Sequence, residues 1–242
     1  MNKLKASTIK VEHLSQSDIQ NMFIVFSTYY ENVKFDKFHI DLFEKDKVIL
    51  LRDQDVIRGF STLKIFWIKV GSIKIKGLFS GDTIIDGGYW GQTALTMEFF
   101  KNVLIEKLKT PLNPFYWYLI SKGFKTYLLL TNNFQNYCPR FDRKNTTNEN
   151  VILDSFAKLL HEDNYDQSKK ILVFKDKTDH LKKEIAPITE EMKENSHIKF
   201  FTEKNPNWAR GDELCCVGKV DFGLAMRYLS RTLLKKLKSR TK

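Results

Sequence analysis

Hydrophobic residues recur with the spacing of a helix near the start of the chain. After Ser15 and Ser17, apolar side chains return every three or four residues, which places them on one face of a helix. That face consists of Ile19, Met22, Phe23, Phe26 and Tyr30. Serine side chains accept hydrogen bonds from the first amides of a helix, so the sequence predicts a helix that begins at these serines.

The pattern then changes to β-branched and aromatic runs that are typical of strands. Val56–Trp67 and Ser72–Asp86 are two such runs, and the short connection near Lys69–Gly71 predicts that they form an antiparallel pair. Gly123–Leu130 is predicted as a further strand of the same sheet. Shorter strands are predicted at Phe38–Phe43 and Lys47–Leu51.

The segment Leu78–Glu98 combines the end of a strand, a glycine-rich turn and the start of a helix. Gly87 and Gly88 interrupt the strand, and Gly91 permits close approach to the backbone. Helix-forming residues return from Thr93 onward. A helix start of this kind presents unpaired amides and a partial positive charge, which suits a phosphate group. A tight connection without a ligand is the alternative interpretation of the same glycines.

The segments after this helix are predicted from prolines and from polarity. Pro111 and Pro114 separate the helix from Phe115–Lys122, which is predicted as an aromatic helical segment. The polar segment Thr131–Arg140 is predicted as a short helix.

The last hundred residues predict an extension of the sheet. Val151–His161 is predicted as an amphipathic helix, Ile171–Phe174 and Gly211–Val217 as strands, and His180–Lys204 as irregular. The polar segment Asp142–Glu149 lacks periodicity and favours a boundary. We therefore expect a core of residues 1–145 and an extension of residues 146–242 that completes the sheet or covers an acceptor site.

A hairpin, a glycine turn, a helix, a strand and a short helix with a tyrosine follow one another between Val48 and Phe141. In this order the chain resembles the GCN5-related N-acetyltransferase (GNAT) superfamily. The resemblance implies an α/β (α+β) fold, with a mixed, mostly antiparallel central sheet flanked by helices and residues 1–145 as the core that binds an acyl donor. The implied reaction transfers an acyl group from a thioester to an amine acceptor.

The resemblance also assigns a donor-binding loop. In that family, a loop with the pattern Gln/Arg-x-x-Gly-x-Gly/Ala follows the fourth strand, and its amides hold the pyrophosphate of acyl-CoA. The segment from Gly88 to Thr93 occupies this place, with Gly91 at the first glycine of the pattern. The implied donor-binding residues are Trp90, Gly91, Gln92, Thr93 and Ala94. Because Gly88 stands where Gln or Arg is usual, acyl-CoA and a phosphopantetheine arm on an acyl carrier protein both stay open as donors.

Two residues are candidates for proton transfer. The family often uses a tyrosine after the fifth strand to protonate the departing thiolate, and Tyr137 matches that place. Gly81 interrupts an apolar strand, which indicates a β-bulge whose amides would stabilise an oxyanion. Burial would raise the pKa of Asp82 beside it and make this residue a general base. A packing tyrosine and a structural carboxylate are the alternatives.

Composition and charge indicate a folded protein with an acidic partner. Of the 242 residues, 42% are hydrophobic and 13% aromatic, and the formal net charge is +11. From Arg227 to Lys242 every charged residue is basic, and apolar residues recur there at helical spacing. A basic amphipathic helix of this kind can dock on the core, contact an anionic membrane surface, or bind an acidic acyl carrier protein or nucleic acid.

Cysteine and histidine positions give no metal-binding pattern. Cys138, Cys215 and Cys216 are odd in number and no export signal precedes them, so a reducing compartment and a cytoplasmic protein are expected. The histidines are scattered, and no metal is expected.

Two function classes stay open. The favoured one is an acyltransferase that acts on acyl thioesters, and the alternative is a non-catalytic basic module that binds nucleic acid or an anionic membrane surface. Consecutive aromatic residues at Phe115–Tyr118 are typical of a packed element and not of an exposed stacking platform, which makes nucleic acid the less favoured partner.

Overall fold

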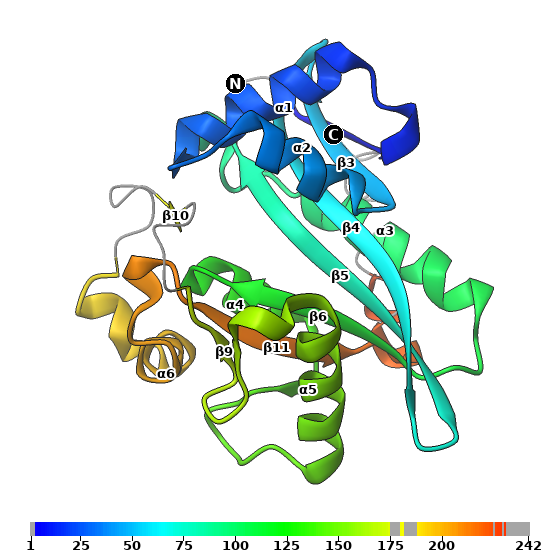
Figure 1. Ribbon diagram of the computed structural model, residues 1–242, viewed down its shortest axis with the longest axis vertical. Coiled ribbons are helices and arrows are strands. Elements are labelled where there is room, and N and C mark those ends of the chain that lie inside the picture. Colours follow the sequence, from blue (N-terminus) through cyan, green and yellow to red (C-terminus); the bar gives the residue numbers. More distant parts are fainter. Residues whose placement is uncertain (1–2, 175–179, 182–187, 225, 229, 231–242) are drawn as a thin grey trace.

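The central element of the protein is a nine-stranded mixed sheet (Figure 1). The structure is a computed structural model that describes residues 3–174, 180–181, 188–224, 226–228 and 230. Within these residues the strand order is β1-β3-β4-β5-β6-β11-β9-β8, and β7 pairs with β11. The strands are β1 (Lys5–Lys10), β3 (Lys47–Asp53), β4 (Val56–Val70), β5 (Ile73–Ile85), β6 (Phe115–Ser121), β7 (Tyr137–Cys138), β8 (Tyr165–Asp166), β9 (Ile171–Leu172) and β11 (Glu213–Lys219).

One pair of strands in this sheet is parallel. β5 and β6 run in the same direction, whereas all other neighbouring strands are antiparallel. Two further short strands, β2 (Tyr30–Glu31) and β10 (His180–Leu181), form a separate antiparallel pair. The sheet is thus mixed and mostly antiparallel and α3 (Ala94–Lys109) joins its two parallel strands, so the predicted fold class is confirmed.

Helices cover both faces of the sheet (Figure 1). Alternate residues of β3 divide between the two faces: Val48 packs in the hydrophobic cluster of α1 (Gln16–Tyr29) and α2 (Phe35–Phe43), and Ile49 in that of α3 (Ala94–Lys109). The same alternation in β6 directs Trp117 toward α3 and α4 (Phe124–Asn133), and Tyr118 toward α5 (Thr147–His161). A further helix, α6 (Ser196–Lys204), packs on α4.

β5 and β6 separate part-way along their length. Their pairing runs from Lys76 opposite Phe115 to Ser80 opposite Leu119. Beyond Ser80, β5 continues to Ile85 beside β4.

A β-bulge lies at the point of separation. Gly81 and Asp82 of β5 together face the single residue Thr62 of β4, which confirms the bulge predicted at Gly81. A Cβ atom at Gly81 would lie 2.6 Å from Thr62 Oγ1, so glycine is required there. A bulged strand bends, and this bend accounts for the separation from β6.

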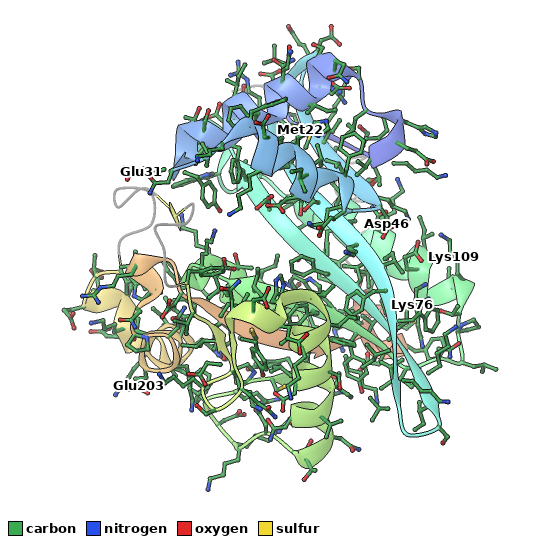
Figure 2. All side chains as sticks on the ribbon, in the orientation of Figure 1. Met22, Glu31, Asp46, Lys76, Lys109 and Glu203 are labelled. Carbon is green, nitrogen blue, oxygen red and sulfur yellow. The ribbon has the colours of Figure 1, made fainter. Side chains whose placement is uncertain are left out.

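The other end of the β5–β6 pair is held by a buried ion cluster. Glu106 of α3 accepts hydrogen bonds from Lys47, Lys76 and Lys109 at 2.8, 2.8 and 2.7 Å. Lys76 belongs to β5, and its side chain is only 3% exposed. Figure 2 shows Lys76 and Lys109 in this part of the molecule. The cluster ties α3 to β3 and β5.

Several predicted elements have a different secondary structure. Phe115–Ser121 is strand β6 and not a helix, and Phe124–Asn133 is helix α4 and not a strand. β6 is buried on both faces, so its apolar residues do not alternate with polar ones. The strand predicted at Phe38–Phe43 is wrong because this segment belongs to α2, and the short helix predicted around Tyr137 is wrong because this residue lies in β7. The segment His180–Lys204 was predicted as irregular, but its last nine residues form helix α6.

Other predictions are confirmed. Ser15 caps α1 by accepting a hydrogen bond from the amide of Asp18, and β4 and β5 form the predicted antiparallel pair. The predicted type and approximate position are also right for four further elements, namely β3, α5, β9 and β11. The basic amphipathic helix predicted at the C-terminus lies largely outside the described residues.

Candidate active site

A cavity of about 440 Å³ opens where β5 and β6 separate. Residues from β4, β5, β6, α3 and α4 line it, together with the end of α1, the start of β2 and the glycine turn. The β-sheet contributes Ser61, Ser80, Thr83, Ile84, Ile85 and Trp117. The helices and their connections contribute Tyr29, Tyr30, Trp90, Gly91, Leu95, Thr96, Phe99, Lys122, Gly123, Lys125, Thr126 and Leu129. The size is that of a small-molecule binding site.

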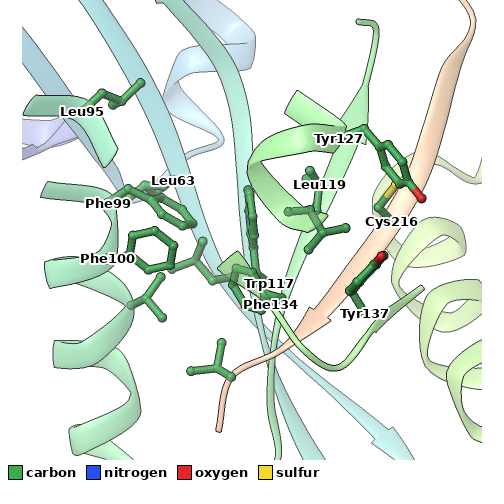
Figure 3. Close-up of a cluster of buried hydrophobic side chains, with 14 of the residues drawn as sticks. Leu63, Leu95, Phe99, Phe100, Trp117, Leu119, Tyr127, Phe134, Tyr137 and Cys216 are labelled. Carbon is green, nitrogen blue, oxygen red and sulfur yellow. The ribbon is translucent and has the colours of Figure 1, made fainter. Parts of the chain in front are cut away.

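The inner end of the cavity is apolar and belongs to the core. Phe99 of α3 and Trp117 of β6 are 4% and 1% exposed, and their ring centroids lie 4.8 Å apart. Leu95 lies beside them on α3, as Figure 3 shows. The polar atoms at this end are bonded to each other, because the indole Nε1 of Trp117 donates to Ser80 Oγ at 2.8 Å. This end therefore suits an apolar group.

The mouth of the cavity is basic. Among the described lining residues, the charged side chains are Lys122 and Lys125, at the start of α4. Lys125 Nζ lies 3.7 Å from the ring centroid of Trp90, and partial burial lowers the pKa of Lys125. Lys122 forms an ion pair with the buried Glu213 at 3.4 Å. A bound anion would therefore meet Lys125 at the mouth, since Glu213 already balances the charge of Lys122.

The predicted donor-binding loop lies at this mouth. Trp90 and Gly91 line the cavity, and Gly91 has a φ of +85°, which explains the need for glycine. Gln92, Thr93 and Ala94 line a second, shallower hollow on the other side of the start of α3. Thr93 precedes the first turn of α3, and its side chain makes no capping hydrogen bond to that turn.

Two of the predicted amides already have partners inside the turn. The amide of Trp90 donates to the carbonyl of Gly87, and the amide of Gln92 donates to that of Tyr89. The side chain of Gln92 accepts a hydrogen bond from the amide of Leu4. Of the predicted donor-binding amides, those of Gly91 and of the first turn of α3 are therefore better placed to bind a phosphate than those of Trp90 and Gln92.

A hydrogen-bond network fixes the glycine turn. Tyr29 donates its hydroxyl proton to Asp86 at 2.9 Å and accepts from the amide of Gly87 at 2.5 Å. On the other side of the turn, Tyr89 donates to Asp53 at 2.6 Å. Burial raises the pKa of Tyr29, so its hydroxyl stays protonated at neutral pH. The sequence analysis missed this residue, which brings a hydroxyl group to the cavity wall.

Tyr137 lies in the core beside the cavity and does not line it. It is 5% exposed, pairs with β11, and lies under the guanidinium group of Arg140 at 4.7 Å. Figure 3 shows it with Tyr127 and Cys216, away from Leu95 and Phe99. Burial raises the pKa of Tyr137. Its role as the acid for the thiolate stays a prediction.

Asp82 lies on the opposite side of the sheet from α3. It lines a small hollow with residues of α1, α2 and the connection between them, such as Phe26, Lys37 and Phe38. The structure therefore does not bring Asp82 and Tyr137 together, and its role as a base also stays a prediction. Thr83, the next residue, does line the main cavity and hydrogen-bonds to Ser61 at 2.7 Å.

Metal-binding groups, reactive thiols and membrane-spanning helices can each be checked in the part of the chain that the structure describes. No group of three histidine, cysteine or acidic residues there has a metal-binding arrangement. Burial raises the pKa values of the thiols of Cys138, Cys215 and Cys216, so they are poor nucleophiles. None of the described helices combines the length and apolarity needed to cross a membrane.

Comparison with known proteins gives matches in structure but not in sequence. No family model matches the chain, and no curated protein matches it. Similar solved structures include a conserved protein of Enterococcus faecalis described as a probable N-acyltransferase, with 12% identity and a TM-score of 0.42. Escherichia coli ElaA has 12% identity and a TM-score of 0.36, and the NatC complex bound to Gag peptide and CoA has 5% identity and a TM-score of 0.40.

The matched regions are partial. The three structures cover 55%, 56% and 57% of this chain, and the matches cover 33%, 88% and 86% of those chains. This chain thus spans about a third of the length of the Enterococcus protein. At such low identity the matches say nothing about substrate or catalytic residues.

Proposed function

We propose that this protein is an N-acyltransferase that transfers an acyl group from a thioester donor to an amine acceptor. The observation that carries the proposal is the separation of the parallel strands β5 and β6 beyond Ser80, with a cavity at the start of α3. In the superfamily that the sequence resembles, a thioester arm lies in this gap like an added strand.

The edge of β5 beyond Ser80 would hold the amides of the donor arm. From Gly81 to Ile85, β5 pairs with β4 on one side, and no described strand pairs with it on the other. A phosphopantetheine arm carries amide groups, and a strand edge that no described strand covers can offer them hydrogen-bonding partners in a regular row. The cavity therefore fits a donor that ends in such an arm.

The phosphates of the donor would lie at the mouth. The amides in the first turn of α3 point toward the N-terminal end of the helix, where the helix dipole is positive. Lys125 is held beside Trp90 at the same mouth, and Lys122 lines it next to Tyr30. These cations support an anionic donor, either CoA or the phosphopantetheine of an acidic carrier protein. The net charge of +11 favours the carrier protein as a partner.

The reaction requires two proton movements. The amine nitrogen attacks the thioester carbonyl carbon, the C–S bond breaks, the amine loses a proton, and the departing thiolate gains one. The backbone amides of the bulge at Gly81 and Asp82 are candidates for the oxyanion donors. Tyr29 is a candidate proton donor for the thiolate, because this residue lines the cavity. In this structure its hydroxyl donates to Asp86 and accepts from the amide of Gly87, so its proton would have to leave the hydrogen bond to Asp86 and pass to the sulfur.

The test measures donor binding and acyl transfer together. Acyl-CoA and acyl carrier protein are titrated into the full chain by calorimetry, and transfer to a panel of amines is followed by mass spectrometry. We expect saturable binding of one donor class and an acylated amine. No donor binding, combined with tight salt-sensitive binding of nucleic acid or anionic vesicles, would instead support a basic binding module.

A further inference from the structure

The cavity reaches from the strand edge of β5 into the space between α3, α4 and β6. The side chains there are Leu95, Phe99, Trp117 and Leu129. The lysines that line the described cavity lie at the opposite end, at the mouth. An elongated site with a basic end and an apolar end suits a ligand with the same distribution of charge.

The donor arm itself does not fit the apolar end. At Ser80 and before it, β5 and β6 are paired with each other and offer no free strand edge. The side-chain polar atoms at that end, Trp117 Nε1 and Ser80 Oγ, are bonded to each other. An amide group placed there would lose its hydrogen bonds to water without replacement, which is costly. A hydrocarbon chain has no such requirement.

The wall at the inner end is the observation that favours an apolar chain. The cavity of about 440 Å³ would hold the arm and the acyl group together. Its inner wall is formed by Phe99 and Trp117, which are almost fully buried, so a group that reaches them is removed from water.

We infer that this apolar end is an acyl-chain pocket, and that the protein takes donors with a medium or long apolar acyl chain in preference to acetyl donors. The inference rests on the proposed function, because it names the acyl group that the same site would transfer. With the thioester carbon at the point where β5 and β6 separate, the chain would pass Ser80 and Leu95 and end against Phe99 and Trp117.

Binding of non-reactive donor analogues tests this without knowledge of the acceptor. S-alkyl thioethers of CoA and of phosphopantetheine, with alkyl chains from two to fourteen carbons, are titrated by calorimetry into the full chain. Each methylene buried in the pocket is expected to raise the affinity about fourfold, until the pocket is full. The length at which the increase stops measures the depth of the pocket.

Two neighbouring phenylalanines give a matched pair of variants. Phe99→Ala removes a ring from the inner wall, so the chain length at which affinity stops increasing (the length limit) is expected to become longer. Phe100→Ala removes the same ring from the next residue, which is similarly buried but packs against Phe134 and Tyr228 and does not line the cavity. This control is expected to leave the length limit unchanged.

A third variant fills the pocket and does not depend on a core truncation that could unfold the protein. Leu129→Phe, from the half-buried side of α4, is expected to shorten the limit and leave binding of the two-carbon analogue within about threefold, since one methylene alone is worth a similar factor.

The outcomes separate the two proposals. Equal affinity for all chain lengths, or the same limit in Phe99→Ala, Phe100→Ala and Leu129→Phe, would overturn the acyl-chain pocket and leave an acetyltransferase in place. Absence of binding for every analogue, with no acyl transfer from any thioester, would overturn the proposed function and this inference with it.

Discussion

β5 and β6 run parallel, and the two ends of their paired region differ in what surrounds them: charged side chains at one end and a cavity at the other. At the first end, Lys76 lies opposite Phe115, and Glu106 joins β3, β5 and α3 through three lysines. At the second end, the strands separate after Ser80, and a cavity takes the place of the pairing. One helix, α3, spans both ends, with Glu106 near its end and Leu95 near its start.

This difference shows how two neighbouring strands of a sheet can separate around a cavity while the rest of the sheet stays paired. An unpaired strand edge and an internal cavity both reduce stability, because hydrogen bonds and packing are missing. The ion cluster fixes α3 against β3 and β5 where the strands are paired. The separation at the other end then lies next to a helix whose position is fixed by the paired end.

The largest expected effect comes from breaking the paired end. In Glu106→Gln, the buried Lys76 loses its negative partner, so we expect a loss of about 3–5 kcal/mol in the free energy of unfolding. Denaturant titration monitored by circular dichroism measures it. The matched control is Glu190→Gln, which removes a carboxylate that is 88% exposed and paired with Lys193. The control should change stability by less than about 0.5 kcal/mol. Equal effects in the two variants would mean that the cluster is not a main source of stability.

The same cluster predicts a pH dependence. Burial alone would raise the pKa of Glu106, but hydrogen bonds from Lys109, Lys47 and Lys76 outweigh it and lower the pKa from 4.5 to about 2. A carboxylate with a lowered folded-state pKa stabilises the fold above its unfolded pKa and loses that contribution as the pH falls. We expect the stability difference between wild type and Glu106→Gln to be full above pH 4.5 and to shrink toward pH 2. A difference that stays constant over this range would contradict the assignment.

The sequence predicted the open end better than the elements that surround it. The β4–β5 pair, the bulge at Gly81 and the helix after the glycine turn are all local features, and each has its own residue signal. β6 was missed because Phe115, Trp117, Tyr118 and Leu119 are buried on both faces, and a continuous apolar run has no period that separates a strand from a helix. α4 was taken for the missing strand for the same reason, although Phe124, Tyr127 and Leu130 follow a three-residue spacing.

The candidate site shows a second limit of sequence analysis. Tyr29 and Asp86 are 57 residues apart and meet only because α1 ends beside the glycine turn. The cavity wall formed by Phe99 and Trp117 likewise depends on how α3 packs on β6. Local patterns identify a turn that can bind an anion, but they do not identify which distant side chains complete the site.

A smaller effect is expected from the turn at the open end. Gly91 and Gly71 both have positive φ, +85° and +58°, and a Cβ at either would meet no neighbouring atom. Gly91→Leu and Gly71→Leu should therefore each cost about 1–2 kcal/mol in backbone strain. Only Gly91 lines the cavity, so only Gly91→Leu should weaken binding of an acyl-CoA or acyl carrier protein, by about tenfold or more, since that corresponds to about 1.4 kcal/mol. Calorimetry compares the two variants, and equal donor affinity in both would place the donor elsewhere.

The smallest structural change separates the two tyrosines. Tyr29→Phe and Tyr137→Phe each remove one hydroxyl and keep the ring, so differences in turnover report the hydroxyl alone. We expect Tyr29→Phe to lower turnover more, because Tyr29 lines the cavity and Tyr137 does not. The Tyr29 hydroxyl also holds the glycine turn through Asp86 and Gly87, so donor affinity is measured in the same variant, and an unchanged affinity separates loss of an acid from a disturbed turn. Loss of a general acid typically costs about a hundredfold to ten-thousandfold. If Tyr137→Phe shows such a loss with unchanged donor affinity, the acid predicted from the sequence is the right one and the site must rearrange when the donor binds.

Asp82→Asn in the same assay tests the base, since loss of a base acts on the acidic limb of the pH profile, and an unchanged profile would make this carboxylate structural.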